Sequence, residues 1–122
     1  MRKVLAILLV LTSMPAMAAE PDWSANRIMP WCRALVSNRE MQDYFNQGLC
    51  GGMINGIVYV LSQSAVTGVL PITSRLCVPG EATMGQIQKI VIQYIDQRPQ
   101  RFHEDFRLLA IEALMAAWSC KR

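Results

Sequence analysis

The sequence has a single histidine, His103, among its 122 residues. Catalytic triads need a base that activates a serine or a cysteine. His103 is followed by Glu104 and Asp105, but neighbours in sequence on a helix point to different faces. The H-E-x-x-H and G-x-S-x-G patterns are both absent. His103 therefore fits a capping or surface residue near a helix start better than a general base.

Other signatures of chemistry are missing as well. No C-x-x-C pair occurs, which argues against zinc modules and thiol oxidoreductases. The only adjacent glycines, Gly51 and Gly52, lie in an apolar stretch without the lysine of a phosphate-binding loop. Two of the carboxylates of Asp96, Glu104 and Asp105 could act as the acidic pair of a glycosidase. These residues fit better as charges that complement a helix dipole and keep the surface soluble. We expect no catalytic site, no metal and no cofactor, and a binding protein is favoured over an enzyme.

The N-terminus has the pattern of a secretory signal peptide. Two basic residues precede an unbroken apolar run, Val4 to Leu11, and Ala16-Met17-Ala18 supplies the small residues that a signal peptidase reads. An N-terminal membrane anchor fits less well, because a spanning helix needs about 20 apolar residues. We expect cleavage after Ala18, which divides the chain into a signal peptide (1–18) and one mature domain (19–122).

The mature chain carries little net charge. The full sequence has a formal charge of +3, but removing the signal peptide leaves ten basic against nine acidic residues, about +1. Binding to nucleic acid needs several clustered basic side chains. Here Arg98, Arg101 and Arg107 are interleaved with acidic residues. We therefore expect no nucleic-acid partner.

All four cysteines lie in the mature chain. Cys32, Cys50, Cys77 and Cys120 are an even set in an exported domain, which predicts two disulfides. Their spacings match no zinc module. Three pairings are possible in principle.

Apolar residues recur at helical spacing in four segments, and no convincing period-2 strand is present. This predicts an all-α domain, a compact bundle of four main helices. Residues 20–29 contain turn formers and are expected to be irregular. Pro30 is expected in the first turn of the first helix, which is either short or continues past a break near residues 37–38 through Met41, Tyr44 and Phe45. A turn at 46–48 precedes a second helix at about 49–64.

The third helix has the clearest local signals. Thr83 and Gln86 form the pattern of a capping box, and Pro99 ends the helix. The fourth helix is expected from about Arg101 to Trp118. A connection of a few residues favours antiparallel packing of these two helices.

Antiparallel packing would place the start of the third helix beside the end of the fourth. Cys77 precedes that start and Cys120 follows that end, so the geometry predicts a Cys77–Cys120 bridge. Cys32 and Cys50 then remain as the second pair.

The sequence carries no charge from Tyr44 to Ser74. Polar residues interrupt this stretch, so a central buried helix of a soluble domain fits better than a membrane-spanning one. Gly48, Gly52 and Gly56 recur every fourth residue and share one helix face. Because such glycines destabilise a helix, we expect another backbone to approach this smooth face closely.

A set of ordered motifs resembles a known family. The set consists of Cys50-x-Gly52-x-Ile54-x-Gly56, Cys77-Val78-Pro79, Thr83-x-x-Gln86, Val91, Tyr94-Ile95, Pro99, Ala113-Leu114 and Trp118-Ser119-Cys120. In this order and spacing, over about residues 28–120, the chain is similar to the Rap/Tai-type immunity proteins of type VI secretion systems. Many members have an aromatic residue at the place of Met53 and proline at the place of Ser119.

The resemblance implies a small periplasmic protein, often a homodimer, without stable membrane insertion after signal cleavage. Its relatives bind and block a peptidoglycan amidase delivered by neighbouring cells, so the expected mechanism is occlusion of the amidase's cleft. The candidate contact surfaces are an apolar loop before the third helix and the polar face of that helix. Their residues are Val69, Leu70, Ile72, Arg75, Gln86, Lys89 and Gln93.

Four alternatives stay open at this point. The apolar loop at 65–75 fits packing over the core as well as it fits an exposed binding surface. The smooth glycine face could serve subunit packing. Small helical, disulfide-bonded periplasmic proteins also act as acid-stress chaperones, although these usually carry many titratable groups at their interface and this chain has nine acidic residues and one histidine. A relative without a cognate toxin is also possible.

Overall fold

Four α-helices carry most of the chain that the computed structural model describes, which comprises residues 21–37 and 43–120. They are α1 (Ala25–Val36), α2 (Tyr44–Thr67), α3 (Met84–Asp96) and α4 (Phe106–Trp118), with short 3-10 turns η1 (Ile72–Ser74) and η2 (Pro99–Arg101). The prediction of an all-α fold with four main helices is confirmed. The expected signal peptide and most of the expected break near residues 37–38 lie outside the described residues.

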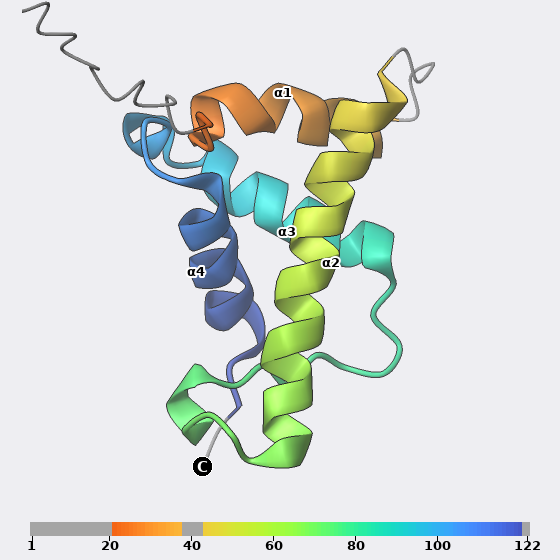
Figure 1. Cartoon of the computed structure of the whole chain (residues 1–122), viewed down its shortest axis with the longest axis vertical. Coiled ribbons are helices and arrows are strands. Elements are labelled where there is room, and N and C mark those ends of the chain that lie inside the picture. Colours follow the sequence, from red (N-terminus) through yellow and green to blue (C-terminus); the bar gives the residue numbers. More distant parts are fainter. Residues whose placement is uncertain (1–20, 38–42, 121–122) are drawn as a thin grey trace, which may run out of the picture.

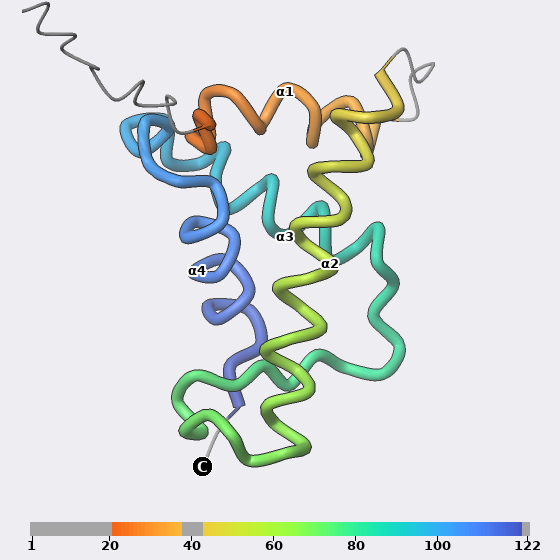
Figure 2. The backbone as a smooth tube through the Cα atoms, viewed as in Figure 1, coloured from red at the N-terminus to blue at the C-terminus, as the bar shows by residue number. Residues whose placement is uncertain are grey.

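The helices are arranged as two crossing pairs. In Figure 1, α1 and α3 run across one end of the molecule, whereas α2 and α4 run down from it. The tube in Figure 2 shows the connection after α2 passing beneath the end of α4 before it turns back to α3. After their shared turn, α3 and α4 run at an angle to one another and pack against each other, with Tyr94 of α3 beside Glu112 of α4.

The hydrophobic core lies where all four helices meet. The largest fully buried side chains come from α1, α2, α3, α4 and the segment before α3: Ile28, Met29, Ile54, Leu76, Ile95, Phe106, Leu109 and Leu114. Full burial of such side chains stabilises the fold by about 1.5–3 kcal/mol each relative to exposure.

The first helix begins earlier than expected. Ala25 opens α1, and Pro30 lies inside it and not in its first turn. An interior proline removes one helical hydrogen bond and is destabilising. The start of α1 is held instead by the α3–α4 turn, because the Ala25 amide donates to the Glu104 carbonyl at 2.9 Å and the Asn26 amide to the Phe102 carbonyl at 2.8 Å.

The starts of α2 and α4 also differ from expectation. Residues 46–48 are not a turn but part of α2, because the Asp43 carboxylate accepts a hydrogen bond from the Asn46 amide at 3.1 Å and caps the helix five residues before the expected start. Asp105 accepts a hydrogen bond from the Arg107 amide at 2.8 Å, so α4 begins at Phe106. The third helix begins as predicted, with Thr83 capping Gln86 at 3.2 Å.

Both disulfide pairings are confirmed. Cys32–Cys50 joins α1 to α2 with a Cα–Cα distance of 5.5 Å, and Cys77–Cys120 has a Cα–Cα distance of 4.9 Å. The second bridge joins the segment before α3 to the residues that follow α4. The extended segment before α3 lies beside the end of α4, where the Cys77 amide donates to the Trp118 carbonyl at 2.8 Å and the Cys120 amide to the Arg75 carbonyl at 3.0 Å.

The uncharged helix α2 is buried on one side only. It is long and apolar enough to cross a membrane by length and composition, yet only 22% of its most apolar window is buried in the fold. The expectation of a central buried helix is therefore wrong for its outer face. A Cβ atom built at Gly48, Gly52 or Gly56 would meet nothing within 4 Å, so the expected close approach of another backbone does not occur within the described chain.

Candidate functional site

The first predicted contact surface is the loop between α2 and η1. Gly68 ends α2 with a left-handed φ of 70°, and its amide donates to the Ser64 carbonyl at 3.0 Å. Beyond η1, the Arg75 guanidinium reaches back and its Nε donates to the Leu70 carbonyl. The Leu76 amide donates to the Leu61 carbonyl at 3.2 Å, which fastens the far end of the loop to α2. The loop thus has a defined shape held at both ends.

The loop divides its apolar residues between the core and the solvent. Leu70 and Ile72 are half-buried, and Arg75 is half-buried around its hydrogen bond to the loop. Val69 remains 78% exposed. The loop therefore packs partly over the core and partly faces solvent, and Val69 is the apolar residue of the predicted set that it exposes.

The second predicted surface is the outer face of α3. Gln86, Lys89 and Gln93 are all exposed there, opposite the buried Ile87 and Val91. This follows from the amphipathic pattern of α3, whose apolar and polar residues alternate with helical period.

Gln93 borders a shallow groove between α3 and α4 that the sequence did not indicate. The groove has a volume of about 270 Å³ and is lined by Ile90, Gln93, Tyr94, Gln97, Ala113, Ala116 and Ala117. Three alanines leave the surface of α4 low beside the longer side chains of α3. A run of small residues at helical spacing near the chain end was the available signal.

The two predicted surfaces do not form one continuous patch. Figure 1 shows η1 at the far end of α2 and α4, whereas α3 crosses the molecule near the opposite end. A partner that contacts both would have to extend along much of the molecule.

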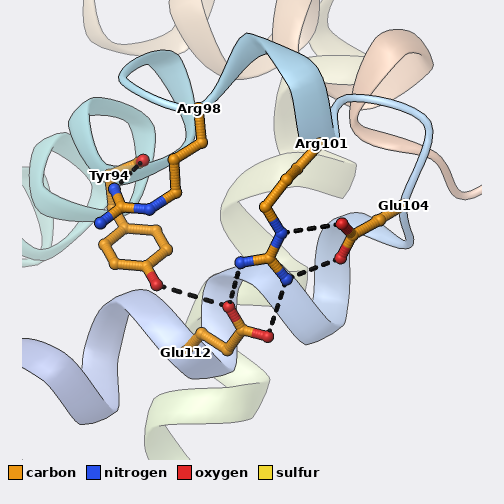
Figure 3. A network of polar contacts seen from close by, with 5 residues as sticks. All are labelled: Tyr94, Arg98, Arg101, Glu104 and Glu112. Atoms are coloured by element: carbon orange, nitrogen blue, oxygen red, sulfur yellow. Dashed lines mark hydrogen bonds and ion pairs between the residues drawn. The ribbon is translucent and has the colours of Figure 1, made fainter.

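A network of polar contacts lies over the turn between α3 and α4 (Figure 3). The guanidinium of Arg101 stands between two carboxylates, at 2.6 Å from Glu104 Oε2 and 2.6 Å from Glu112 Oε2. The Tyr94 hydroxyl donates to Glu112 at 3.4 Å, and the Arg98 guanidinium lies 3.6 Å from the centre of the Tyr94 ring. These contacts join η2, α3 and α4.

The charges in this network pair with one another and link the turn before α4 to α4 itself. Hydrogen bonds from Arg101 lower the pKa of both Glu104 and Glu112, and the same bonds raise the pKa of Arg101. Asp105 also has a lowered pKa, because Arg107 donates hydrogen bonds to it. A glycosidase acid needs a raised pKa. The lowered pKa values of these carboxylates fit a charge-pairing role.

The other residues considered for a chemical role are Asp96, His103 and the four cysteines. Asp96 pairs with Arg33 of α1 at 2.6 Å. His103 is exposed in the turn before α4. Residues 21–37 and 43–120 contain no group of three His, Cys, Asp or Glu side chains that could hold a metal ion, and the four cysteines there are all in disulfides.

Comparison with known proteins gives one match. A family model described as Rap1a immunity proteins matches residues 24–120, which is nearly all of the described chain. No curated protein and no solved structure matches the chain. The family match agrees with the resemblance carried by the ordered motifs.

Proposed function

We propose, because the chain belongs to the Rap1a immunity protein family, that it protects its own cell by binding and occluding a peptidoglycan amidase delivered by a type VI secretion system. The family match supports a role in immunity against a secreted effector. The amidase and the delivery route rest on the ordered motifs that resemble the Rap/Tai-type family.

The proposed compartment is the periplasm. Disulfides persist in oxidising compartments and are rare in a reducing cytosol. Two of them join distant parts of this small domain, and the N-terminal sequence has the pattern of an export signal. A peptidoglycan amidase acts in the same compartment, so the inhibitor and its target would meet there.

The proposed mechanism is occlusion by a rigid surface, without a chemical step in the immunity protein. Val69 is presented by a loop whose ends are held by Arg75 and by hydrogen bonds to α2. The polar face of α3 offers Lys89 and Gln93 for hydrogen bonds to the amidase. A surface that is already ordered loses little conformational freedom on binding, which favours a tight complex. We further propose, from the resemblance, that the protein works as a homodimer.

We expect a gene for a small cysteine–histidine amidase beside the gene of this protein, and the decisive experiment uses that amidase. We expect the purified mature protein to form a stoichiometric complex with it and to abolish release of muropeptides from isolated peptidoglycan. Full hydrolysis in the presence of a several-fold molar excess would refute the proposal. An acid-stress chaperone would instead suppress aggregation of a denatured client at low pH.

The contact surfaces can be tested separately with single charges. Val69→Glu places a charge on the exposed loop and Gln93→Glu places one on α3, and each should weaken binding of the amidase at least tenfold if its surface is in the interface. Asn26→Glu is the matched control, because it adds the same charge at an exposed position in the first turn of α1. Wild-type affinity for both test variants would remove these surfaces from the interface.

A further inference from the structure

The two disulfides differ in their exposure to solvent. Cys32 and Cys50 are both 0% exposed and belong to the hydrophobic core between α1 and α2. In the other bridge, Cys77 is exposed and Cys120 is half-buried. A disulfide is opened by a thiolate that must reach one of its sulfur atoms, so access decides which bridge can react in the folded protein. The Cys77–Cys120 bridge, called the exposed bridge from here on, meets that condition and the buried bridge does not.

The surroundings of the exposed bridge are open and uncharged. Pro79 on the connection to α3 and Ser119 at the end of α4 are both exposed. Neither residues 76–80 nor residues 113–120 include an acidic or basic side chain. The attacking thiolate is negatively charged, and a carboxylate close to the sulfur atoms would repel it. The two segments that carry the exposed bridge add no such repulsion.

Backbone hydrogen bonds hold the two cysteines together independently of their sulfur atoms. The Cys77 amide donates to the Trp118 carbonyl at 2.8 Å, and the Cys120 amide donates to the Arg75 carbonyl at 3.0 Å. These bonds form a short antiparallel pairing of the two segments. Molecules that stay folded after the S–S bond is cut therefore keep both sulfur atoms close, and the bridge can close again.

We propose that the exposed bridge is a thiol–disulfide exchange site for a partner protein that carries a Cys-x-x-Cys dithiol, and that this partner attacks the sulfur of Cys77. Cys77 is the point of attack because it is the more exposed of the two cysteines. The buried bridge stays closed during the exchange and keeps α1 joined to α2.

The exchange has two steps. In the first, the thiolate of one partner cysteine attacks Sγ of Cys77 and forms a mixed disulfide. The Cys77–Cys120 bond breaks, and its electron pair leaves with Sγ of Cys120, which takes up a proton from water. In the second step, the partner's other thiolate attacks the partner's own sulfur in the mixed disulfide, and Cys77 leaves as a thiolate that is protonated. The exposed bridge has gained two electrons, and the partner's dithiol has become a disulfide.

This exchange would change the stability of the fold. The exposed bridge closes a sequence separation of 43 residues, against 18 for the buried bridge. In the chain-entropy model, a bridge that closes a longer loop stabilises the folded state more. Reduction at the exposed bridge alone should therefore lower the melting temperature, and oxidised glutathione should restore it by closing the bridge again.

The first test reduces the wild-type mature protein with dithiothreitol in native buffer, blocks the free thiols with iodoacetamide and locates them by mass spectrometry. The buried bridge of the same molecule is the matched control. Among molecules with two blocked cysteines, those blocked at Cys77 and Cys120 should outnumber those blocked at Cys32 and Cys50 at least tenfold. In concentrated guanidinium chloride, where burial is lost, the two bridges should react at similar rates.

Urea distinguishes direct attack from attack after unfolding. The exposed bridge should be reduced at a rate that changes less than twofold as urea rises to just below the unfolding transition. Reduction of the buried bridge should accelerate over the same range, because it follows opening of the fold. A variant with both Cys32→Ala and Cys50→Ala keeps only the exposed bridge and should be reduced at the wild-type rate.

A trapping experiment tests the point of attack. The probe is thioredoxin with the second cysteine of its Cys-x-x-Cys motif replaced by serine, which cannot complete the second step. It should accumulate as a mixed disulfide on Cys77 of the wild-type protein. A mixed disulfide on Cys120 would overturn the assigned attack, and the absence of any mixed disulfide would overturn the dithiol partner.

Three further results would contradict the exchange site. They are equal blocking of both bridges in native buffer, reduction of the exposed bridge that accelerates with urea in parallel with unfolding, and a melting temperature that oxidised glutathione does not restore. The isolated protein suffices for each measurement, so these outcomes do not depend on amidase binding. A protein that exchanges at Cys77 but never binds the amidase would refute the proposed function and leave the exchange site standing.

Discussion

The contribution of Thr83 to the free energy of unfolding can be measured with a single substitution. Its hydroxyl accepts the Gln86 amide at 3.2 Å and caps α3. We expect Thr83→Ala to lower the free energy of unfolding by about 1 kcal/mol, the usual cost of losing such a cap. Urea denaturation would measure it. Thr73→Ala, at an exposed position in η1, is the control and should change the unfolding free energy by less than half as much. Equal effects of the two substitutions would show that the cap does not stabilise the helix.

Capping residues also show what could be read from the sequence. Thr83 was found because its bond joins residues three apart, within the reach of a local pattern. Asp43 and Asp105 cap α2 and α4 by similarly short bonds, so both helix starts were available from the sequence. The sequence favours other boundaries, because residues 46–48 are turn formers and the apolar residues at helical spacing begin at Phe102.

At the scale of elements, the first helix could not be placed from the sequence. The turn formers before Pro30 indicate irregular structure, and they are helical because α1 begins against the α3–α4 turn. The Ala25 and Asn26 amides donate to carbonyls of that turn, and the Phe106 amide donates to the Trp23 carbonyl at 2.8 Å. These bonds join segments nearly eighty residues apart, which no local pattern contains. The outer face of α2 is similar, since a helix that is apolar all round does not reveal which side stays open.

The polar network on the α3–α4 turn should make this part of the fold sensitive to acid. The pKa values of Glu104 and Glu112 are lowered from an ordinary value of 4.5 by Arg101. A carboxyl whose pKa is lower in the folded state stabilises the fold above its ordinary pKa, and the stabilisation is lost as the pH falls through the lowered value. We therefore expect the melting temperature to fall progressively below about pH 4.5.

Glu112→Gln isolates the contribution of the network. The variant should melt at a lower temperature than wild type at pH 7, and the difference should shrink as the pH falls and Glu112 becomes protonated in the wild type. Glu81→Gln is the control at an exposed position outside the network. Melting curves measured from pH 3 to pH 7 would test this, and a difference that grows toward acid would contradict it.

At the scale of the whole molecule, the two disulfides clamp opposite ends. Cys32–Cys50 joins α1 to α2 across a separation of 18 residues, and Cys77–Cys120 joins the connection before α3 to the end of α4 across 43. The pairing of Cys77 with Cys120 was predicted correctly from the expected packing of α3 against α4. Proximity of Cys77 to the chain end comes from the extended segment beside α4.

Removing the larger clamp should unfold the protein without touching a binding surface. We expect replacement of both Cys77 and Cys120 by alanine to lower the free energy of unfolding by about 4 kcal/mol, and replacement of both Cys32 and Cys50 to lower it by about 3 kcal/mol. Urea denaturation under oxidising conditions measures both. Loss of protection in cells should follow the loss of folded protein. Unchanged melting with lost protection would show that the bridge serves the contact instead.

The two disulfides also bear on when the chain becomes stably folded. Together they account for about 7 kcal/mol, which is comparable to the whole net stability of a typical domain. Under the export that we propose, a newly made precursor with reduced thiols would lack that contribution, which would favour the unfolded state that a translocation channel admits. The disulfides would then form, and the fold become stable, only in the compartment where we propose that the effector is met.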